Sequence, residues 1–404
     1  MIYKNIKELM TLAGVHQKDG RHLQPEDLSI QKNITVVEKM GKITWLGDFK
    51  NLPQEFAQDQ IIDCQNLVAT PALVDSHTHL VFGGDRSFEY SMKLNGATYE
   101  EIAQAGGGIL NTMESTLKTS LKELRASAIQ RLETLISYGI KTVEIKSGYA
   151  LEYQREKELS YLIADLKKEF EGRIVIFNTY MCAHAVPKNY ISSHEFIKKV
   201  VIPLMEELSQ DKIIDAVDIF HEVDYFDADD VKTLFEKAHE LKLPVKIHAD
   251  EFNDNDGARL AAKYQALSAD HLLATSDKGI KALAESNTVA TLLPGTAFFL
   301  GKPLARARDF LDAGCKVALA TDYNPGSCHC DNLMLIAQLS GKNLKMNSAE
   351  IFAGITYNAA HALGLRNQGA IIVGMDAKLS FFKTSSLDML LYHWGKNFAI
   401  TPQV

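Results

Sequence analysis

The sequence predicts an α/β fold, a (β/α)8 barrel accompanied by a small β-sandwich domain that the N- and C-terminal segments build together. Three observations lead to this fold class. Eight apolar, β-rich runs lie between about residue 65 and about residue 325, helical segments separate them, and short β-like segments lie at both ends of the chain. Strands that alternate with helices pair in parallel, and eight such units close into a barrel.

The eight apolar runs provide the predicted barrel strands. In chain order they read NLVATPALVDSHTH, IKTVEIKSGY, RIVIFNTYMCAHAVP, AVDIFHEVDYF, LPVKIHADEF, ALSADHLL, NTVATLLPGTAFFL and KVALATDYNPG. The segments between them, such as LKELRASAIQRLETLISYG, repeat leucine and isoleucine at intervals of three and four residues and close on glycine. This pattern is typical of amphipathic helices.

The two ends of the chain have a different pattern. LSIQKNITVVEKMGKITWLGD reads as short strands around a turn at Gly41, and GAIIVGMDAKLSFFKT near the C-terminus is similar. We therefore expect residues 1–66 and 368–404 to form the small β domain, and residues 67–367 to form the barrel with the functional site.

Composition excludes several classes of partner. The net charge is −8 and both signs are interspersed, so nucleic acid is not an expected partner. Five cysteines, an odd number scattered along the chain, make a poor disulfide framework and suit a reducing cytoplasm. The opening MIYKNIKELM lacks an apolar export signal, and the longest apolar stretch is too short to cross a membrane. We expect a cytoplasmic protein that acts on a small molecule.

Two histidines end the first predicted barrel strand. Side chains at i and i+2 of a strand point to one face, so His77 and His79 can present two imidazoles side by side, as metal ligands do. For an isolated His-x-His pair, ordinary polar residues at a strand end are an equal alternative.

Other strand ends carry the same kind of residue. His248 ends the fifth strand with Glu251 three residues on, His271 ends the sixth, and Asp322 ends the eighth. Active sites of barrel enzymes lie at the C-terminal ends of the strands. Three imidazoles and a carboxylate would hold a divalent or ferric ion that activates water, while His271 and Glu251 remain free to move protons. The pattern predicts a hydrolytic site.

These residues resemble the metal-dependent amidohydrolase superfamily over essentially the whole chain. Within it, PALVDSHTHLVFGGDR, VEIKSGY, AHAVP, HADEF, LLPGTAFFL and TDYNPGS are similar to the imidazolonepropionase family. The resemblance implies one Zn2+ or Fe3+ per chain, held by His77, His79, His248 and Asp322. It also implies a homodimer.

The resemblance further implies a substrate pocket. Its expected residues are Arg86, Tyr149, His184, Glu251, Asn324, Gly326 and Ser327. Arg86 and Tyr149 would hold the substrate, because a guanidinium can grip a carboxylate with two hydrogen bonds. The residue-level alternatives are a surface salt bridge for Arg86 and simple packing for Tyr149.

The implied reaction is hydrolysis of the lactam C–N bond of 4-imidazolone-5-propanoate to N-formimidoyl-L-glutamate, the third step of histidine degradation. Glu251 would transfer protons and contact the ring nitrogen. His271 would stabilise the developing oxyanion, and Asp322 is a second candidate for proton transfer that the sequence does not rank against Glu251.

Three further segments bear on the kind of metal site and on the barrel mouth. DIFHEVDYF on the fourth strand has no lysine, which favours a mononuclear metal site over a carbamate-bridged pair. CHCDN follows the NPGS match, and Cys328 and Cys330 lack a partner pair for a zinc site of their own. AGGGIL, with Gly106–Gly108, lacks the lysine of a phosphate loop and is expected to be a loop over the barrel mouth.

Two other functions stay open. A deaminase of the same superfamily, acting on a cytosine-like or guanine-like ring, would have similar ligands, but its substrate would offer no carboxylate to Arg86 and Tyr149. A non-catalytic metal-binding barrel would be expected to have a damaged site, whereas the four ligands, His271 and Glu251 are all present.

Overall fold

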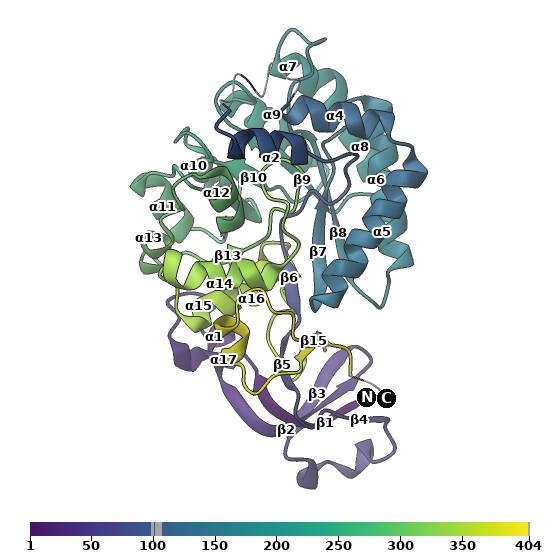
Figure 1. The fold of residues 1–404 in the computed structure, drawn as a ribbon, viewed down its shortest axis with the longest axis vertical. Helices are drawn as coiled ribbons and strands as arrows, with labels where there is room; N and C mark the ends of the chain where they lie inside the picture. The colour runs from purple at the N-terminus through teal and green to yellow at the C-terminus, as the bar shows by residue number, and fades with distance from the viewer. Residues whose placement is uncertain (98–100, 102–106, 403–404) are drawn as a thin grey trace.

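The computed structural model describes residues 1–97, 101 and 107–402 (Figure 1). Figure 1 shows a barrel surrounded by helices, with a separate β-sheet at the end of the molecule opposite to helices α2, α4 and α7. Of the predicted loop Gly106–Gly108, the first glycine lies outside the described residues.

The barrel consists of eight parallel strands that follow one another around it in chain order. They are β6 (Leu73–Asp75), β7 (Ile140–Lys146), β8 (Val175–Ala183), β9 (Ala216–His221), β10 (Ile247–Ala249), β11 (Ser268–His271), β12 (Val289–Leu292) and β13 (Val317–Leu319). Closure occurs just past the ends of β6 and β13, where the His79 N–H donates to the Tyr323 carbonyl at 3.0 Å and the Asp322 N–H donates to the His77 carbonyl at 3.0 Å. The predicted (β/α)8 barrel is confirmed.

Helices connect the strands and cover the barrel. They are α2 (Ser87–Leu94), α4 (Ile109–Lys118), α5 (Leu121–Ser137), α6 (Tyr153–Glu169), α7 (Ser193–Phe196), α8 (Ile202–Gln210), α9 (Ala228–Glu240), α10 (Gly257–Lys263), α11 (Asp277–Ala284), α12 (Pro294–Leu300) and α13 (Ala307–Asp312). Helix α5 begins with a capping box, in which Ser120 and Glu123 each accept the other's backbone N–H. It ends before Gly139, whose φ of 86° is favourable for glycine.

Helices that follow β13 lead the chain back to the small sheet. They are α14 (Leu333–Asn343), α15 (Ser348–Gly354), α16 (Tyr357–His361) and α17 (Asp388–Tyr392), and a π-helical turn over Ile197–Val201 joins α7 to α8. Within the described residues, no helix combines the length and apolar content needed to cross a bilayer.

The separate sheet has seven strands from both ends of the chain. They are β1 (Ile2–Met10), β2 (Ile30–Lys39), β3 (Lys42–Gly47), β4 (Ile61–Asp63), β5 (Val68–Pro71), β14 (Leu379–Phe382) and β15 (Ala399–Ile400). Their order is β15-β14-β5-β1-β2-β3, with β4 also paired to β1. N-terminal Ile6 and Val36 share a buried cluster with C-terminal Leu379 and Phe381, which joins the two segments. The extra domain is thus present. Its boundaries at residues 66/67 and 367/368 stay a prediction, and β5 pairs in this sheet.

The first helix, α1 (Ala13–Gln17), and a 3-10 turn, η1 (Pro25–Leu28), lie between β1 and β2. Two further 3-10 turns, η2 (Phe49–Asn51) and η3 (Gln54–Phe56), lie between β3 and β4. Strand β5 leads into β6 through Ala72 alone, so the small sheet is attached directly beneath the first barrel strand (Figure 1).

Candidate metal centre and active site

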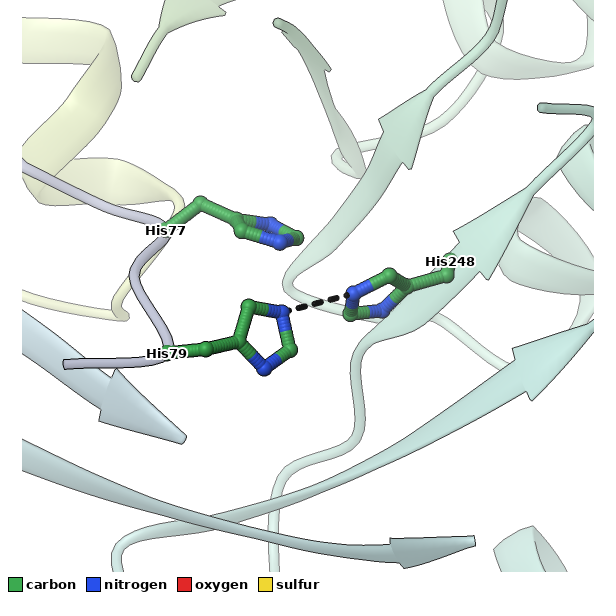
Figure 2. Close-up of side chains that lie close together, drawn as sticks. All are labelled: His77, His79 and His248. Atoms are coloured by element: carbon green, nitrogen blue, oxygen red, sulfur yellow. Dashed lines mark hydrogen bonds between the residues drawn. The ribbon is translucent and has the colours of Figure 1, made fainter. Parts of the chain in front are cut away.

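Three histidine side chains from two barrel strands point at one another (Figure 2). His77 and His79 follow the end of β6, and His248 lies in β10. Their ring nitrogens lie within 4.8 Å of one another, and all three side chains are buried. The strand ends thus bring together three neutral-imidazole ligands on the face where barrel enzymes carry their active sites.

Four potential ligand atoms of this group converge on one small region. The Nε2 atoms of His79 and His248 are 3.3 Å apart, and the Nε2 of His77 is buried without a hydrogen-bond partner. The Asp322 Oδ1 is 3.4 Å from the His77 Nε2 and 3.7 Å from the His79 Nε2. Lone pairs that converge this closely repel unless an ion or proton lies between them, so the donor set fits a transition metal such as zinc.

Carboxylates hold two of the three rings from behind. The His77 Nδ1 is 2.7 Å from the Asp270 Oδ2, and the His248 Nδ1 is 3.2 Å from the Asp218 Oδ1. An Nδ1–H that donates to a carboxylate fixes the ring and leaves Nε2 as the metal-binding atom. Asp322 is held in turn by the Thr296 hydroxyl, which donates to its Oδ2 at 2.6 Å.

Burial sets the protonation of this group. Desolvation, followed by the positive charge of neighbouring groups, holds the pKa of His77, His79 and His248 well below 6.5. The imidazoles are therefore neutral and able to bind a metal at neutral pH. Burial also raises the pKa of Asp322 to about 7, although the Thr296 hydroxyl opposes this shift.

Glu251 and His271 lie beside the histidine group. The His271 Nε2 is 3.6 Å from the Glu251 Oε2, and the His271 ring lies 5.2 Å from the His248 ring, centroid to centroid. Burial raises the pKa of Glu251 well above its usual value, with the Asp322 charge as the next cause. Burial lowers the pKa of His271 to about 4. A neutral acid and a neutral imidazole are thus side by side, suited to proton transfer.

The backbone around these residues is unusual. His271 has φ 80° and Asp322 has φ 51°, conformations that L-residues seldom adopt.

The Glu222 carboxylate accepts the N–H groups of Phe252 and Asn253 at 2.8 and 3.3 Å. Glu222 therefore fixes the loop that follows Glu251.

Tyr149 and His184 adjoin the histidine group on another side. The His184 ring stacks on the His79 ring at 5.0 Å and 21°, and the Tyr149 ring lies 5.6 Å from the His79 ring. Glu156 is buried and accepts the N–H groups of Gly148 and Ala150 at 3.1 and 2.7 Å, which fixes the backbone on both sides of Tyr149. The expected pocket residues Tyr149 and His184 therefore contact a candidate metal ligand.

Arg86 lies near Tyr149 and Gly326 and already has an acidic neighbour. Its Nε and Nη2 donate to the Glu89 Oε2 at 2.9 and 2.7 Å, which leaves its Nη1 side unengaged by Glu89. Nη1 lies against Gly326, where a Cβ atom would come within 2.0 Å of it. The Arg86 charge also opposes the upward shift in the pKa of Tyr149, which burial causes. Arg86 thus forms an ion pair that is largely buried rather than on the surface, and its contact with substrate stays a prediction.

The NPGS segment forms its own turn. The Asn324 side-chain oxygen accepts the N–H groups of Gly326 and Ser327, each at 2.8 Å, and its amide donates to the Asp322 carbonyl at 2.7 Å. Asn324 thus shapes the pocket wall beneath Arg86. In the following segment, the Cys328 thiol is buried and free, and neither it nor Cys330 belongs to a metal-binding group within the described residues.

Sequence reasoning assigned no role to the charged residues inside the barrel. Glu144, Lys146, Asp218, Lys246 and Asp270 are fully buried in or next to strands β7, β9, β10 and β11. Charged residues within otherwise apolar strand runs were the available signal, since charged groups are seldom buried unless they are paired. Thr296, in the LLPGTAFFL segment, was likewise unassigned.

Known proteins are similar to this chain over nearly its whole length. An amidohydrolase family model matches residues 68–402. Proteins named imidazolonepropionase are 39% identical over 398 residues in Bacillus velezensis and 41% identical over 395 residues in Bacillus cereus. The alignments cover 98% and 97% of this chain, and 93% and 92% of those relatives.

Solved structures share the fold at lower identity. Atrazine chlorohydrolase from Arthrobacter aurescens, complexed with zinc, has a TM-score of 0.72 at 14% identity and covers 98% of this chain and 92% of its own. Guanine deaminase from C. acetobutylicum, with bound guanine, has a TM-score of 0.67 at 17% identity, with 94% and 90% covered. At these identities the likeness bears on the fold alone.

Proposed function

The chain belongs to the imidazolonepropionase family of the amidohydrolases, and from that premise we propose how its own residues perform the reaction. The reaction is hydrolysis of the lactam C–N bond of 4-imidazolone-5-propanoate to N-formimidoyl-L-glutamate, a step of histidine degradation. The observation that carries the proposal is the convergence of His77, His79 and His248, with Asp322 beside them.

We propose that these four residues hold one Zn2+ or Fe3+ per chain. The buried, unpartnered Nε2 of His77 and the close approach of the His79 and His248 Nε2 atoms support this ligand set. When bound, such an ion activates water and polarises a carbonyl oxygen. The carboxylates behind His77 and His248 keep both rings aimed at the ion.

Proton transfer falls to Glu251 in this proposal. Its carboxylate would accept a proton from the attacking water as the C–O bond forms and pass that proton to the lactam nitrogen as the C–N bond breaks; burial favours the protonated form that this transfer passes through. His271, which lies within 3.6 Å of Glu251, would donate a hydrogen bond to the carbonyl oxygen as negative charge develops there. Asp322 is the second candidate for proton transfer, because its carboxylate lies beside the histidine group.

The substrate propionate would bind at Arg86. Glu89 engages Nε and one Nη2 hydrogen, so the Nη1–Nη2 edge of the guanidinium can still receive a carboxylate with two hydrogen bonds. Tyr149 and His184, packed on His79, would bind the imidazolone ring. Asn324, Gly326 and Ser327 would form the wall that keeps Arg86 in place.

Metal analysis together with a substrate assay tests this function. The purified protein should contain about one zinc or iron per chain and should remove the ultraviolet absorbance of imidazolonepropionate. The variants His248→Ala and Asp322→Ala should lose the metal, because each removes a ligand. A full metal content in the His77→Ala/His79→Ala double variant would refute the site. Guanine is the comparison substrate, and its deamination in preference to imidazolone hydrolysis would favour the deaminase alternative.

We also propose that the protein acts in the cytoplasm. The five cysteines are all free, which suits the reducing cytoplasm. We propose a homodimer from the family resemblance, and light scattering of the purified protein would measure its mass in solution.

A further inference from the structure

A network of buried charges lies beneath the candidate metal centre. It contains Glu144, Lys146, Asp218, Lys246 and Asp270, and all five side chains have no exposed surface. These residues come from four different barrel strands or their ends. Burial of five charges is costly, so their presence calls for a role beyond filling the barrel.

Lys146 occupies a particular place in this network. Its Nζ is 2.5 Å from the Asp218 Oδ2 and 3.6 Å from the Asp270 Oδ2. Asp218 uses its other oxygen for His248, and Asp270 uses the same Oδ2 for His77. A single ammonium group thus lies between the two carboxylates that hold the two histidine rings.

Lys246 has a different set of contacts. Its Nζ donates to the Glu144 Oε2 at 2.8 Å and to the Ser76 carbonyl at 2.9 Å, and it is 3.7 Å from Asp270. Within the described residues Lys246 forms no ion pair with Asp218, so of the two aspartates behind the rings it contacts only Asp270, which holds His77. The two lysines therefore differ in how many metal-binding histidines they can affect.

Both lysines also lie beside a second group of potential metal ligands. His77, Glu144 and Asp270 have ligand atoms within 4.8 Å of one another. Lys146 and Lys246 both contact the Glu144 Oε2, at 3.0 and 2.8 Å, and both approach Asp270. Two ammonium groups supply positive charge here, which disfavours a second metal ion and leaves Asp270 to orient His77.

We propose that Lys146 is a positioning residue of the metal centre: its ammonium group fixes Asp218 and Asp270 so that His248 and His77 keep their Nε2 atoms aimed at the ion. The inference rests on the proposed metal site. Without Lys146, Asp218 Oδ2 has no cation beside it and Asp218 keeps only the Ile219 N–H and His248 at its other oxygen, while Asp270 loses one of its two cations. Both carboxylates are then held less firmly, and the orientation of both rings is less well fixed. Lys246 acts on one ring and should have a smaller effect.

Metal affinity of the apoprotein tests this role. Zinc competition between a chromophoric chelator and Lys146→Met should give a dissociation constant about 10- to 100-fold higher than that of the wild type, the range for residues that orient metal ligands. Lys246→Met should show a smaller increase. The matched control is Lys316→Met, which removes another buried lysine from its ion pair with Asp19 and should stay within about twofold of wild type.

Histidine tautomers of the metal-free protein give a second readout that does not depend on activity. In 15N-histidine spectra, His77 and His248 of the wild type should carry their proton on Nδ1, and Lys146→Met should show mixed tautomers at both rings. Lys316→Met should retain the wild-type pattern. Loss of packing alone would not select these two rings.

The outcomes separate the inference from the proposed function. Wild-type protein that binds no zinc would refute the metal site, and the tautomer spectra would then decide the role of Lys146 by themselves. Zinc affinity within about twofold of wild type together with unchanged tautomers in Lys146→Met, or an equal loss in Lys316→Met, would overturn the inference. If Lys146→Met does not fold, Lys146→Met/Glu144→Gln keeps the network's net charge and is measured in its place.

Discussion

Replacing Arg86 with methionine tests the proposed carboxylate grip. The guanidinium lies at the pocket wall formed by Gly326, and its side chain is 16% exposed. Arg86→Met keeps most of the apolar volume of the side chain and removes its charge and its hydrogen bonds. Since the propionate is distant from the scissile bond, the grip acts in the ground state and the transition state alike. We therefore expect KM to rise while kcat changes little.

The magnitude follows from the contacts. A substrate carboxylate left without its charged partner costs about 2–4 kcal/mol in kcat/KM, a loss of roughly 30- to 900-fold. Glu89 matters here, because its side chain is only 5% exposed and stays behind when Arg86 is removed. Its charge would then repel the propionate, so Arg86→Met should fall in the upper half of that range. Arg86→Met/Glu89→Gln lacks this repulsion and should fall in the lower half.

The assay is steady-state loss of imidazolone absorbance with two substrates. The two substrates are imidazolonepropionate and an imidazolone without the propionate arm. Each is measured with wild type, Arg86→Met, Arg86→Met/Glu89→Gln and Glu89→Gln. Glu89→Gln is the matched control, because its amide oxygen still accepts from Arg86 and KM should change little. Arg86→Lys should recover part of the affinity, since an ammonium lacks the two-pronged geometry.

Two results would refute this reasoning. If Arg86→Met handles imidazolonepropionate as well as wild type does, Arg86 serves only as the salt-bridge partner of Glu89. If the variant loses the same factor on the substrate without the propionate arm, Arg86 shapes the pocket and binds no carboxylate. Either result would mean that another residue binds the propionate of the substrate.

Further predictions concern the same pocket and the metal. Gly326→Ala should raise KM as Arg86→Met does, because its Cβ would displace Nη1; steady-state kinetics will measure it, and an unchanged KM would contradict the wall. Glu251→Gln should keep its metal and substrate affinity but lower kcat by about 100-fold or more, whereas metal loss on elemental analysis would identify a ligand. Metal affinity should fall about tenfold per pH unit below pH 7 and level off above pH 7. Burial raises the pKa of Asp322 to about 7 in the metal-free protein, so metal binding below that pH must release the Asp322 proton. The histidines release no proton, because their pKa values lie well below 6.5. Chelator competition from pH 5.5 to 8 measures this slope, and a metal affinity that stays constant between pH 5.5 and 7 would contradict it.

The barrel was predictable because its signal repeats. Eight apolar runs separated by helical patterns leave few topologies to consider, and the polar residues at their ends mark the carboxyl face of the barrel. The His77 and His79 pair was ambiguous by itself, and only the repetition of polar strand ends at His248, His271 and Asp322 turned it into a site prediction. The repeating pattern of apolar residues therefore predicts the strands and helices. The polar residues at the ends of the apolar runs predict the site.

The charged barrel interior was not predictable in the same way. Lys146 lies in VEIKSGY and Asp270 in SADHLL, and neither segment tells which residue of a distant strand its charge will meet. Pairing of Lys146 with Asp218 joins residues 72 positions apart in the sequence. Strand register decides such contacts, and register depends on closure of the whole barrel rather than on any local pattern. The ion pair of Arg86 with Glu89 is local, yet its competition with a substrate carboxylate becomes visible only in three dimensions.

Backbone strain at the strand ends connects the fold to the chemistry. His271 and Asp322 both have positive φ, which costs about 1–3 kcal/mol for each non-glycine residue. The barrel compensates at the same places: the Asp322 N–H donates to the His77 carbonyl, and the Leu272 N–H donates to the Ala249 carbonyl at 3.1 Å. These bonds join each strained residue, or the residue after it, to the end of a neighbouring strand. Two of the proposed functional groups thus lie at strained positions that hydrogen bonds within the barrel hold in place, so the closed barrel stabilises the backbone conformation from which His271 and Asp322 reach the histidine group.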